Sequence, residues 1–418
     1  MFIYENNTLF CEGVAIDKIA EKEKTPLYIY SEKALIENFN SLDNAFADVP
    51  HVICYSVKCN SNISILKLLA RAGAGFDIVS GGELFRVIQA GGDPGKVVYA
   101  GVGKTQDEIV YALKSDIHLF TVESVGELDR INDLANRMGK KARIAIRVNP
   151  DVDPKTHTYI STGKKENKFG LDIETAREIY KHASGLPSVK PVGIQMHIGS
   201  QITQTQPFKN ALDKLIPLIG QLRSDGIELE YVDIGGGLGI VYKDEKPMTA
   251  QEFADVVVPM VKPLGLTLII EPGRFIAGNA GILVTKVEYI KKSGEKTFVI
   301  VDAAMNDLMR PALYSAYHNI LPVKRQNDRP TKPVDIVGPV CESGDFFAQD
   351  RVIALPAQDD LLAVMSAGAY GFTMTSNYNC RVRPPEILVN GTSYSQIRRR
   401  ETWEDLVRQE VSLKESMS

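Results

Sequence analysis

The chain has 418 residues, of which 44% are hydrophobic and 24% charged, with a net charge of −4 at neutral pH. This length exceeds what one small core supports, so two domains are expected. No long basic block is present, which argues against nucleic-acid binding. No apolar run approaches the roughly 18 residues that a membrane-spanning helix needs.

The first residues and the cysteines indicate a cellular compartment. The N-terminus has no basic segment followed by an apolar one, as an export signal would. The five cysteines are scattered and form no closely spaced pair. We therefore expect a cytoplasmic protein with neither disulfides nor a metal site.

The first 277 residues have the pattern of a barrel. Residues 1–27 read as a hairpin, and eight short apolar runs follow between residues 51 and 274. The runs are HVICYSVK, GFDIVS, VVYAG, IHLFTV, ARIAIRV, PVGIQMHIG, LEYVDIGGG and LTLIIEPGR. Amphipathic segments separate them, and three of these begin with a capping-box pattern, at Thr105, Ser124 and Thr249. Apolar strands alternating with helices predict a parallel sheet, and eight such units predict an α/β fold of the (β/α)8 TIM-barrel type.

From about residue 278 the pattern changes to strands and turns. A hairpin is expected around KSGEK, three further β-rich runs follow, and a last amphipathic helix is expected in TWEDLVRQEVSL. We therefore predict a barrel domain at 28–277 and a second, mostly-β domain formed by 1–27 together with 278–418.

Residues with chemical potential follow the predicted strands, where the active sites of such barrels lie. Lys58 ends the first run, and a lysine in that place can attack a carbonyl as a nucleophile, although a solvated charge is the ordinary alternative. Asp77 lies in the second run and His197 in the sixth. The glycines at 235–237, followed one unit later by EPGR at 271–274, match the phosphate cradle of these barrels, although glycines also serve tight turns.

Together these features indicate pyridoxal phosphate as the cofactor. Glu271 would hold the pyridine nitrogen protonated and so complete the electron sink. An ion pair between Glu271 and Arg274 is the structural alternative. Other barrels with a reactive lysine, such as aldolases, would not need this carboxylate.

Seven motifs in the same order resemble those of the fold-type III pyridoxal-phosphate-dependent decarboxylases, over essentially the whole chain. The motifs are YSVKCN, HIGS, DIGGGLG, EPGR, NDLMRPALY, GPVCESGD and GAYG. The resemblance is strongest to members that convert meso-2,6-diaminopimelate to L-lysine and carbon dioxide, the last step of lysine biosynthesis. It implies pyridoxal 5′-phosphate bound covalently at Lys58, with Asp77 near the lysine, His197 against the ring and Glu271 at the pyridine nitrogen. It further implies cofactor contacts, mainly to the phosphate, from Ser200, Gly235, Gly236, Gly237, Pro272, Gly273, Arg274 and Tyr370.

The same resemblance assigns the second domain its roles. Cys341 would be the acid that returns a proton after carbon dioxide leaves, from a segment that reaches the neighbouring subunit of a homodimer. Substrate contacts are implied for Arg274, Arg310, Tyr314, Glu342 and Tyr370. Guanidinium groups bind a carboxylate in a forked geometry, and Glu342 can pair with the distal amine.

Cys11, Cys54 and Cys380 are expected to be small buried residues, the usual fate of a free cysteine.

Three alternatives stay open from the sequence. A relative that acts on ornithine, lysine or arginine would have little use for Arg310, because these substrates lack the distal carboxylate. An alanine racemase would need a tyrosine as second base. A non-catalytic pyridoxal-phosphate-binding carrier would end with the barrel, and a regulator of this kind would release no carbon dioxide.

Overall fold

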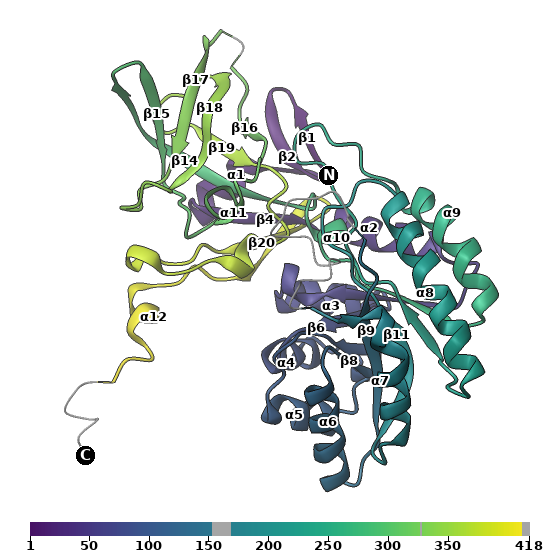
Figure 1. The fold of residues 1–418 in the computed structure, drawn as a ribbon. Helices are drawn as coiled ribbons and strands as arrows, with labels where there is room; N and C mark the ends of the chain where they lie inside the picture. Colours follow the sequence, from purple (N-terminus) through teal and green to yellow (C-terminus); the bar gives the residue numbers. More distant parts are fainter. Residues whose placement is uncertain (153–168, 327, 412–418) are drawn as a thin grey trace. The chain divides into compact units, whose positions relative to one another are not determined.

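The computed structural model describes residues 1–152, 169–326 and 328–411 (Figure 1). Contacts divide the chain into two compact units. The barrel unit is Leu35–Ala277, and the β unit is Met1–Ala34 together with Gly278–Ser418.

Eight parallel strands form a closed barrel in the barrel unit. In chain order they are β5 (His51–Ser56), β6 (Gly75–Ile78), β7 (Val97–Tyr99), β8 (Leu119–Val122), β9 (Ala142–Asn149), β11 (Val189–Gln195), β12 (Tyr231–Asp233) and β13 (Thr267–Ile270). Each pairs with the next, and β13 pairs with β5, which closes the ring. A short strand, β10 (Leu171–Asp172), pairs with β9 outside the ring. Each of the eight apolar runs contains one barrel strand, so the predicted (β/α)8 barrel is confirmed.

Helices lie along the outside of these strands (Figure 1). They are α2 (Glu32–Ala45), α3 (Ile63–Arg71), α4 (Gly81–Gln89), α5 (Gln106–Lys114), α6 (Val125–Arg137), α7 (Ile173–Gly185), α8 (Gln206–Ser224), α9 (Ala250–Val261) and α10 (Arg274–Ala277), with the 3-10 turns η1 (Val57–Cys59), η2 (Pro94–Lys96) and η4 (Lys262–Leu264). The strands are largely apolar because side chains fill one face and helices cover the other. One buried cluster comprises Cys54, Val98, Leu119, Ala145, Val192 and Ile269.

Two of the three predicted capping boxes form as expected. Thr105 and Thr249 each cap their helix and receive the reciprocal bond from the glutamate three residues on. Ser124 accepts the backbone N–H of Glu127, but the Glu127 side chain turns to Lys104 and to the Glu123 N–H instead. The third capping box is therefore incomplete, because the Glu127 carboxylate binds the buried Lys104 instead of the Ser124 N–H.

The β unit is mostly antiparallel. Its strands are β1 (Phe2–Glu5), β2 (Thr8–Cys11), β3 (Val14–Ala15), β4 (Leu27–Ser31), β14 (Gly281–Ser293), β15 (Lys296–Val301), β16 (Ile320–Pro322), β17 (Thr331–Val337), β18 (Phe346–Ala354), β19 (Leu361–Val364), β20 (Glu386–Asn390) and β21 (Ser393–Arg398). Helices are few and short: α1 (Ile16–Glu23), α11 (Arg310–Tyr314) and α12 (Trp403–Val407), with 3-10 turns η5 (Phe372–Met374) and η6 (Tyr378–Cys380). The large sheet runs β18-β17-β15-β14-β4-β20-β21, while β1, β2 and β3 form a separate sheet. The expected second, mostly-β domain is thus present.

The boundary between the units differs from the one drawn at residue 28. Strand β4 lies within the β sheet, paired with β14 on one side and β20 on the other, and all five of its residues are buried. Pairing on both edges ties β4 to the β unit, so the contacts place the division at residue 35.

The last helix, α12, is shorter than the amphipathic run suggested. The end of that run, from residue 412, lies outside the described residues. Within the described part of the chain, no helix is long and apolar enough to cross a membrane, and no group of three or more metal-ligating side chains gathers.

Candidate active site

Lys58 lies at the carboxyl end of the first barrel strand. Strand β5 stops at Ser56, and Lys58 follows in the 3-10 turn η1, two residues beyond the strand in which it was expected. Its Nζ donates to Oδ2 of Asp77 at 2.7 Å. The Lys58 side chain is 37% exposed, whereas that of Asp77 is fully buried. The amine is therefore held by a buried carboxylate and stays accessible to solvent.

Ser56 connects this lysine to the next strand of the ring. Its Oγ lies 2.7 Å from Oδ2 of Asp77 and 2.9 Å from the backbone oxygen of Glu271. Its backbone N–H donates to the carbonyl of Pro272 at 3.0 Å. The segment that carries Lys58 and the segment EPGR are thus held together by one residue.

The glycine run after β12 packs against both neighbouring strand ends. The N–H of Gly236 donates to Nδ1 of His197 at 3.2 Å, and the N–H of Glu271 donates to the carbonyl of Gly235. A Cβ on Gly236 would lie 2.1 Å from the Glu271 backbone oxygen, and one on Gly237, whose φ is +106°, would lie 2.4 Å from the Gly199 oxygen. Only glycine permits this close approach of three backbones.

His197 is partly buried and faces cationic neighbours. Burial lowers its pKa well below the usual value, and the charges of Arg147 and Lys58 lower it further. The ring is therefore neutral, and because Nδ1 accepts from Gly236 the proton sits on Nε2. A neutral ring in this place can lie flat against an aromatic cofactor.

Glu271 follows β13 and is 4% exposed. Its Oε2 accepts from Nε2 of Gln195 at 3.3 Å, while Oε1 is buried with no N–H donor among the described residues. Burial raises the pKa of Glu271 well above the ordinary value, and the carboxyl groups of Asp233 and Asp77 raise it further. A carboxylate accepts several hydrogen bonds, so Glu271 keeps capacity for a pyridine N–H besides the Gln195 amide, and the residues present fit pyridoxal phosphate.

Arg274 begins helix α10 and is 7% exposed. Its guanidinium donates to the hydroxyl of Tyr242 and, at 3.0 Å, to Oγ of Ser200. Ser200, Gly237 and the Gly273–Arg274 turn come from three consecutive units of the barrel. Their proximity provides a hydroxyl, a guanidinium and bare backbone suited to an anion.

In the β unit, Arg310 is the most firmly held of the predicted substrate residues. It is 7% exposed, and its NH1 donates to Nε2 of His318 at 3.0 Å. The other ring nitrogen of His318 donates to the carbonyl of Met365 at 2.8 Å, which fixes the tautomer that accepts from Arg310. Tyr314 lies on the same helix, α11, and is partly buried.

Cys341 and Glu342 are exposed on the loop CESGD. The backbone of this loop is nevertheless fixed, because the buried carboxylate of Asp345 accepts the N–H groups of Val340 and Met305, each at 2.7 Å. The N–H of Cys341 donates to Oδ1 of Asn379 at 2.8 Å. The loop therefore presents two exposed side chains from a rigid backbone.

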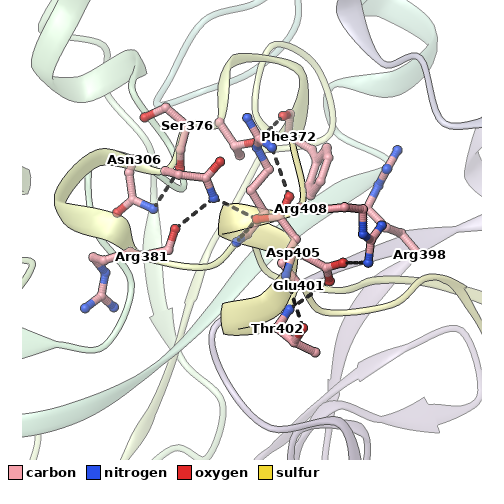
Figure 2. A network of polar contacts seen from close by, with 12 residues as sticks. Asn306, Phe372, Ser376, Arg381, Arg398, Glu401, Thr402, Asp405 and Arg408 are labelled. Atoms are coloured by element: carbon pink, nitrogen blue, oxygen red, sulfur yellow. Dashed lines mark hydrogen bonds and ion pairs between the residues drawn. The ribbon is translucent and has the colours of Figure 1, made fainter. Parts of the chain in front are cut away.

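Asn379, which binds the backbone of Cys341, lies in a segment that is itself held by the polar network in Figure 2. Asn306 exchanges hydrogen bonds with the backbone of Ser376, and Asn377 donates to Glu401 at 2.7 Å. Glu401 also binds Arg383 through its backbone and its guanidinium.

Three residues of the neighbouring segment, Tyr370, Asn379 and Cys380, have left-handed backbones. Tyr370 lies just before the network, with φ of +56°. Cys380 is exposed with φ of +53°, so the expectation that it packs in a core is wrong. Cys11 and Cys54 are buried as expected.

The predicted site residues fall into two sets. The first set lies in the barrel unit and comprises Lys58, Asp77, His197, Ser200, Gly235, Gly236, Gly237, Glu271, Pro272, Gly273 and Arg274. The β unit carries Arg310, Tyr314, Cys341, Glu342 and Tyr370.

Several polar residues near the predicted site residues escaped the sequence analysis: Ser56, Arg147, Gln195, Asp233, His318, Asp345 and Asn379. For Arg147 and Gln195 a signal existed, because each is a polar residue inside an otherwise apolar barrel strand. Such a residue faces either a partner or a site.

Comparison with known proteins defines the class. The family model described as the pyridoxal-binding domain of pyridoxal-dependent decarboxylases matches residues 32–278. The chain therefore belongs to the pyridoxal-dependent decarboxylase family, and pyridoxal phosphate is its cofactor.

Closely similar proteins within that class share one name. The diaminopimelate decarboxylase of Pseudomonas aeruginosa is 50% identical over 405 residues, which is 97% of each chain. The structure of the diaminopimelate decarboxylase of M. jannaschii in complex with L-lysine has a TM-score of 0.94 and 39% identity, covering 99% of this chain and 98% of that one. The corresponding enzyme of Helicobacter pylori, also complexed with L-lysine, has a TM-score of 0.92 and 41% identity, covering 96% and 100%.

Proposed function

We propose that this protein decarboxylates meso-2,6-diaminopimelate to L-lysine and carbon dioxide, with pyridoxal 5′-phosphate as cofactor. One observation carries the cofactor chemistry: Ser56 links the carboxylate that binds Lys58 to the backbone of Glu271. A nucleophilic amine and a buried carboxyl group are thereby held at one barrel mouth. The near-full-length similarity to diaminopimelate decarboxylases selects the substrate.

The barrel residues would hold the cofactor. Lys58 attaches it covalently, and Asp77 keeps the amine in place. Glu271 would pair with the pyridine nitrogen, and the neutral His197 would pack against the ring. The phosphate would be held by the hydroxyl of Ser200 and by the backbone of the glycine loop and of Pro272–Arg274. Tyr370, a residue of the β unit, would contribute a further contact. When bound, pyridoxal phosphate supplies a sink for the electron pair that remains after the α-carboxylate leaves as carbon dioxide.

The residues of the β unit would select the substrate and return the proton. Arg310 binds the distal carboxylate through its forked guanidinium, together with Arg274. Glu342 pairs with the distal amine, with Tyr314 and Tyr370 beside the chain. Cys341 donates the proton from its thiol to the carbon that lost carbon dioxide.

The proposal includes a homodimer in a cytoplasmic setting. Cys341 and Glu342 are exposed on a fixed loop, which suits groups that act in the site of a neighbouring subunit. In a two-fold dimer such sharing is reciprocal.

The test is to incubate purified protein with meso-diaminopimelate, ornithine, arginine and lysine in separate reactions and to measure carbon dioxide. Release from meso-diaminopimelate in clear preference to the other three is expected. A preference for ornithine or lysine would place the protein with the relatives that act on those substrates. No release from any would favour the non-catalytic regulator.

A further inference from the structure

Two carboxyl groups lie together in the barrel, and the roles given above use only one of them. Asp233 ends β12 and Glu271 follows β13, and they are 1% and 4% exposed. The two side chains are hydrogen-bonded to each other. Because ionised carboxylates only accept hydrogen bonds, this contact requires a proton on one of them.

The hydrogen bonds from other residues around the pair leave one oxygen of each carboxyl group without a donor. One oxygen of Asp233 accepts the N–H of Gly235 at 2.8 Å, and one oxygen of Glu271 accepts from Gln195. The remaining oxygens, Oδ2 of Asp233 and Oε1 of Glu271, are buried and receive no N–H or O–H from any other described residue. A proton on either carboxyl group would let it donate to the other and so satisfy a buried acceptor.

The charges that face the pair come from four other elements. They are Asp77 on β6, Lys58 in η1, Arg147 on β9 and, as a titratable thiol, Cys54 on β5. A third buried carboxyl group, that of Asp77, makes full ionisation of the pair still more costly. Burial is the largest cause that raises the pKa of both Asp233 and Glu271. Asp233 accepts the Gly235 N–H at 2.8 Å, whereas Glu271 accepts only the longer 3.3 Å bond from Gln195. The ionised form is therefore better stabilised on Asp233, which favours the proton on Glu271.

We propose that Asp233 is a positioning residue that shares one proton with Glu271, so that Glu271 is held in place and protonated in the cofactor-free protein. Asp233 acts through Glu271 and through the glycine loop that it binds at Gly235. The inference rests on the proposed function only for the statement that Glu271 faces the cofactor nitrogen.

Asp233→Asn is the sharpest test, because asparagine can still accept from Gly235 and can donate its amide to Glu271 while removing one titrating group. Cofactor-free wild type and variant are titrated with pyridoxal phosphate by calorimetry in two buffers of different ionisation enthalpy at one pH. The number of protons exchanged should differ between them by on the order of one. Protons exchanged at Lys58 are common to both proteins and cancel. Equal proton exchange with intact binding would overturn the proposal.

Asp307→Asn is the matched control. Asp307 is 1% exposed, and burial raises its pKa to about 7, but it lies in the β unit and has no assigned role in the site. Its variant should exchange the same number of protons as wild type. A change as large as that in Asp233→Asn would mean that any buried carboxyl group gives the signal, and the proposal would fail.

A second measurement needs no cofactor. A buried acid with a raised pKa contributes stability that is full below its ordinary pKa, near 4, and is lost as pH rises through the raised value. The stability of cofactor-free wild type should therefore fall relative to that of Asp233→Asn as the pH rises above about 4. It should also fall relative to that of Asp307→Asn, up to about pH 7. If Asp233→Asn fails to fold, Glu271→Gln, whose amide can donate to Asp233, should remove the same pH dependence. A pH dependence identical to wild type in both pair variants would overturn the proposal.

These measurements separate this inference from the proposed function, since neither uses decarboxylation. A changed proton exchange without carbon dioxide release from diaminopimelate would leave the acid pair standing and sink the assigned reaction. Carbon dioxide release with unchanged proton exchange would do the reverse.

Discussion

The barrel unit and the β unit hold their candidate residues in opposite ways. In the barrel, Lys58 is held by a buried carboxylate on the adjacent strand β6, and Glu271 by the buried amide of Gln195, two strands away in the ring. In the β unit, Cys341 and Glu342 lie on a loop whose backbone is fixed while the residues themselves are exposed. The candidate barrel residues are thus held from within their own unit, whereas Cys341 and Glu342 are exposed groups on a hydrogen-bonded loop.

Arg310 shows that exposure does not follow from belonging to the β unit. It is buried and bonded to His318, as firmly placed as any barrel residue. The difference therefore lies between a residue held on helix α11 by a buried partner and residues presented on a loop. The following experiments test it, from the largest expected effect to the smallest.

Lys58→Ala should abolish decarboxylation, because the barrel half then lacks its covalent attachment. In wild type, borohydride reduction should fix the cofactor on Lys58, and peptide mapping should find it there. Lys104 is an internal control, since it is buried and bonded to Glu127 and should carry no label. A cofactor adduct on any other lysine would remove the basis of the proposed mechanism.

Cys341→Ala should lower kcat by roughly 10²- to 10⁴-fold, the range expected for loss of a general acid. Cys380→Ala removes another exposed thiol of the same unit and should leave kcat unchanged.

Mixing Lys58→Ala and Cys341→Ala subunits asks which chain Cys341 serves. If it serves the neighbouring chain, random exchange should restore about a quarter of wild-type activity, because half the dimers then hold one intact site. Exchange verified by mass without recovered activity would assign Cys341 to its own chain, or remove it as the proton donor.

Arg310→Ala should lower kcat/KM for meso-diaminopimelate. The loss should correspond to about 2–5 kcal/mol of transition-state binding, the usual cost of truncating one partner of a buried charge pair. Arg399→Ala, an exposed arginine of the same unit paired with Asp405, is the control and should have no effect. Unchanged kcat/KM in Arg310→Ala would mean that the distal carboxylate binds elsewhere.

His318→Asn should have the smallest effect of the series. The shorter side chain loses the bond to Arg310 while its amide can still donate to the Met365 carbonyl, so the guanidinium is less well oriented. We expect KM for diaminopimelate to rise by about fivefold, equivalent to the roughly 1 kcal/mol of one hydrogen bond, with little change in kcat. An equal fall in kcat would mean that His318 does more than orient Arg310.

The barrel was predictable because its strands are locally distinct. Each apolar run, such as ARIAIRV, is buried on both faces, and helix-start signals such as Thr105 and Thr249 stand between the runs. Strand β4 was not predictable, since LYIYS is apolar in either unit, and only pairing with β14 and β20 decides where it belongs.

The candidate site residues divide in the same way, into those that the sequence reveals and those that only the fold reveals. Lys58, the glycine run and Glu271 could be found from the sequence because the chemistry of a barrel gathers at the carboxyl ends of its strands. The sequence also carried the resemblance that named Cys341 and Arg310. It could not show that His318 orients Arg310, because these side chains meet only when α11 and the chain after it fold back.

What the sequence determined by itself is the order of strands, the residue types at their ends and the family motifs, all of which are local in the chain. What only the tertiary structure decided is which of those residues share a proton, a charge or a hydrogen bond. Asp233 and Glu271 are 38 residues apart in the numbering and were unremarkable as a pair. They become one acid pair because parallel pairing of β12 with β13 brings their strand ends together, away from water, where two carboxylates cannot both stay ionised.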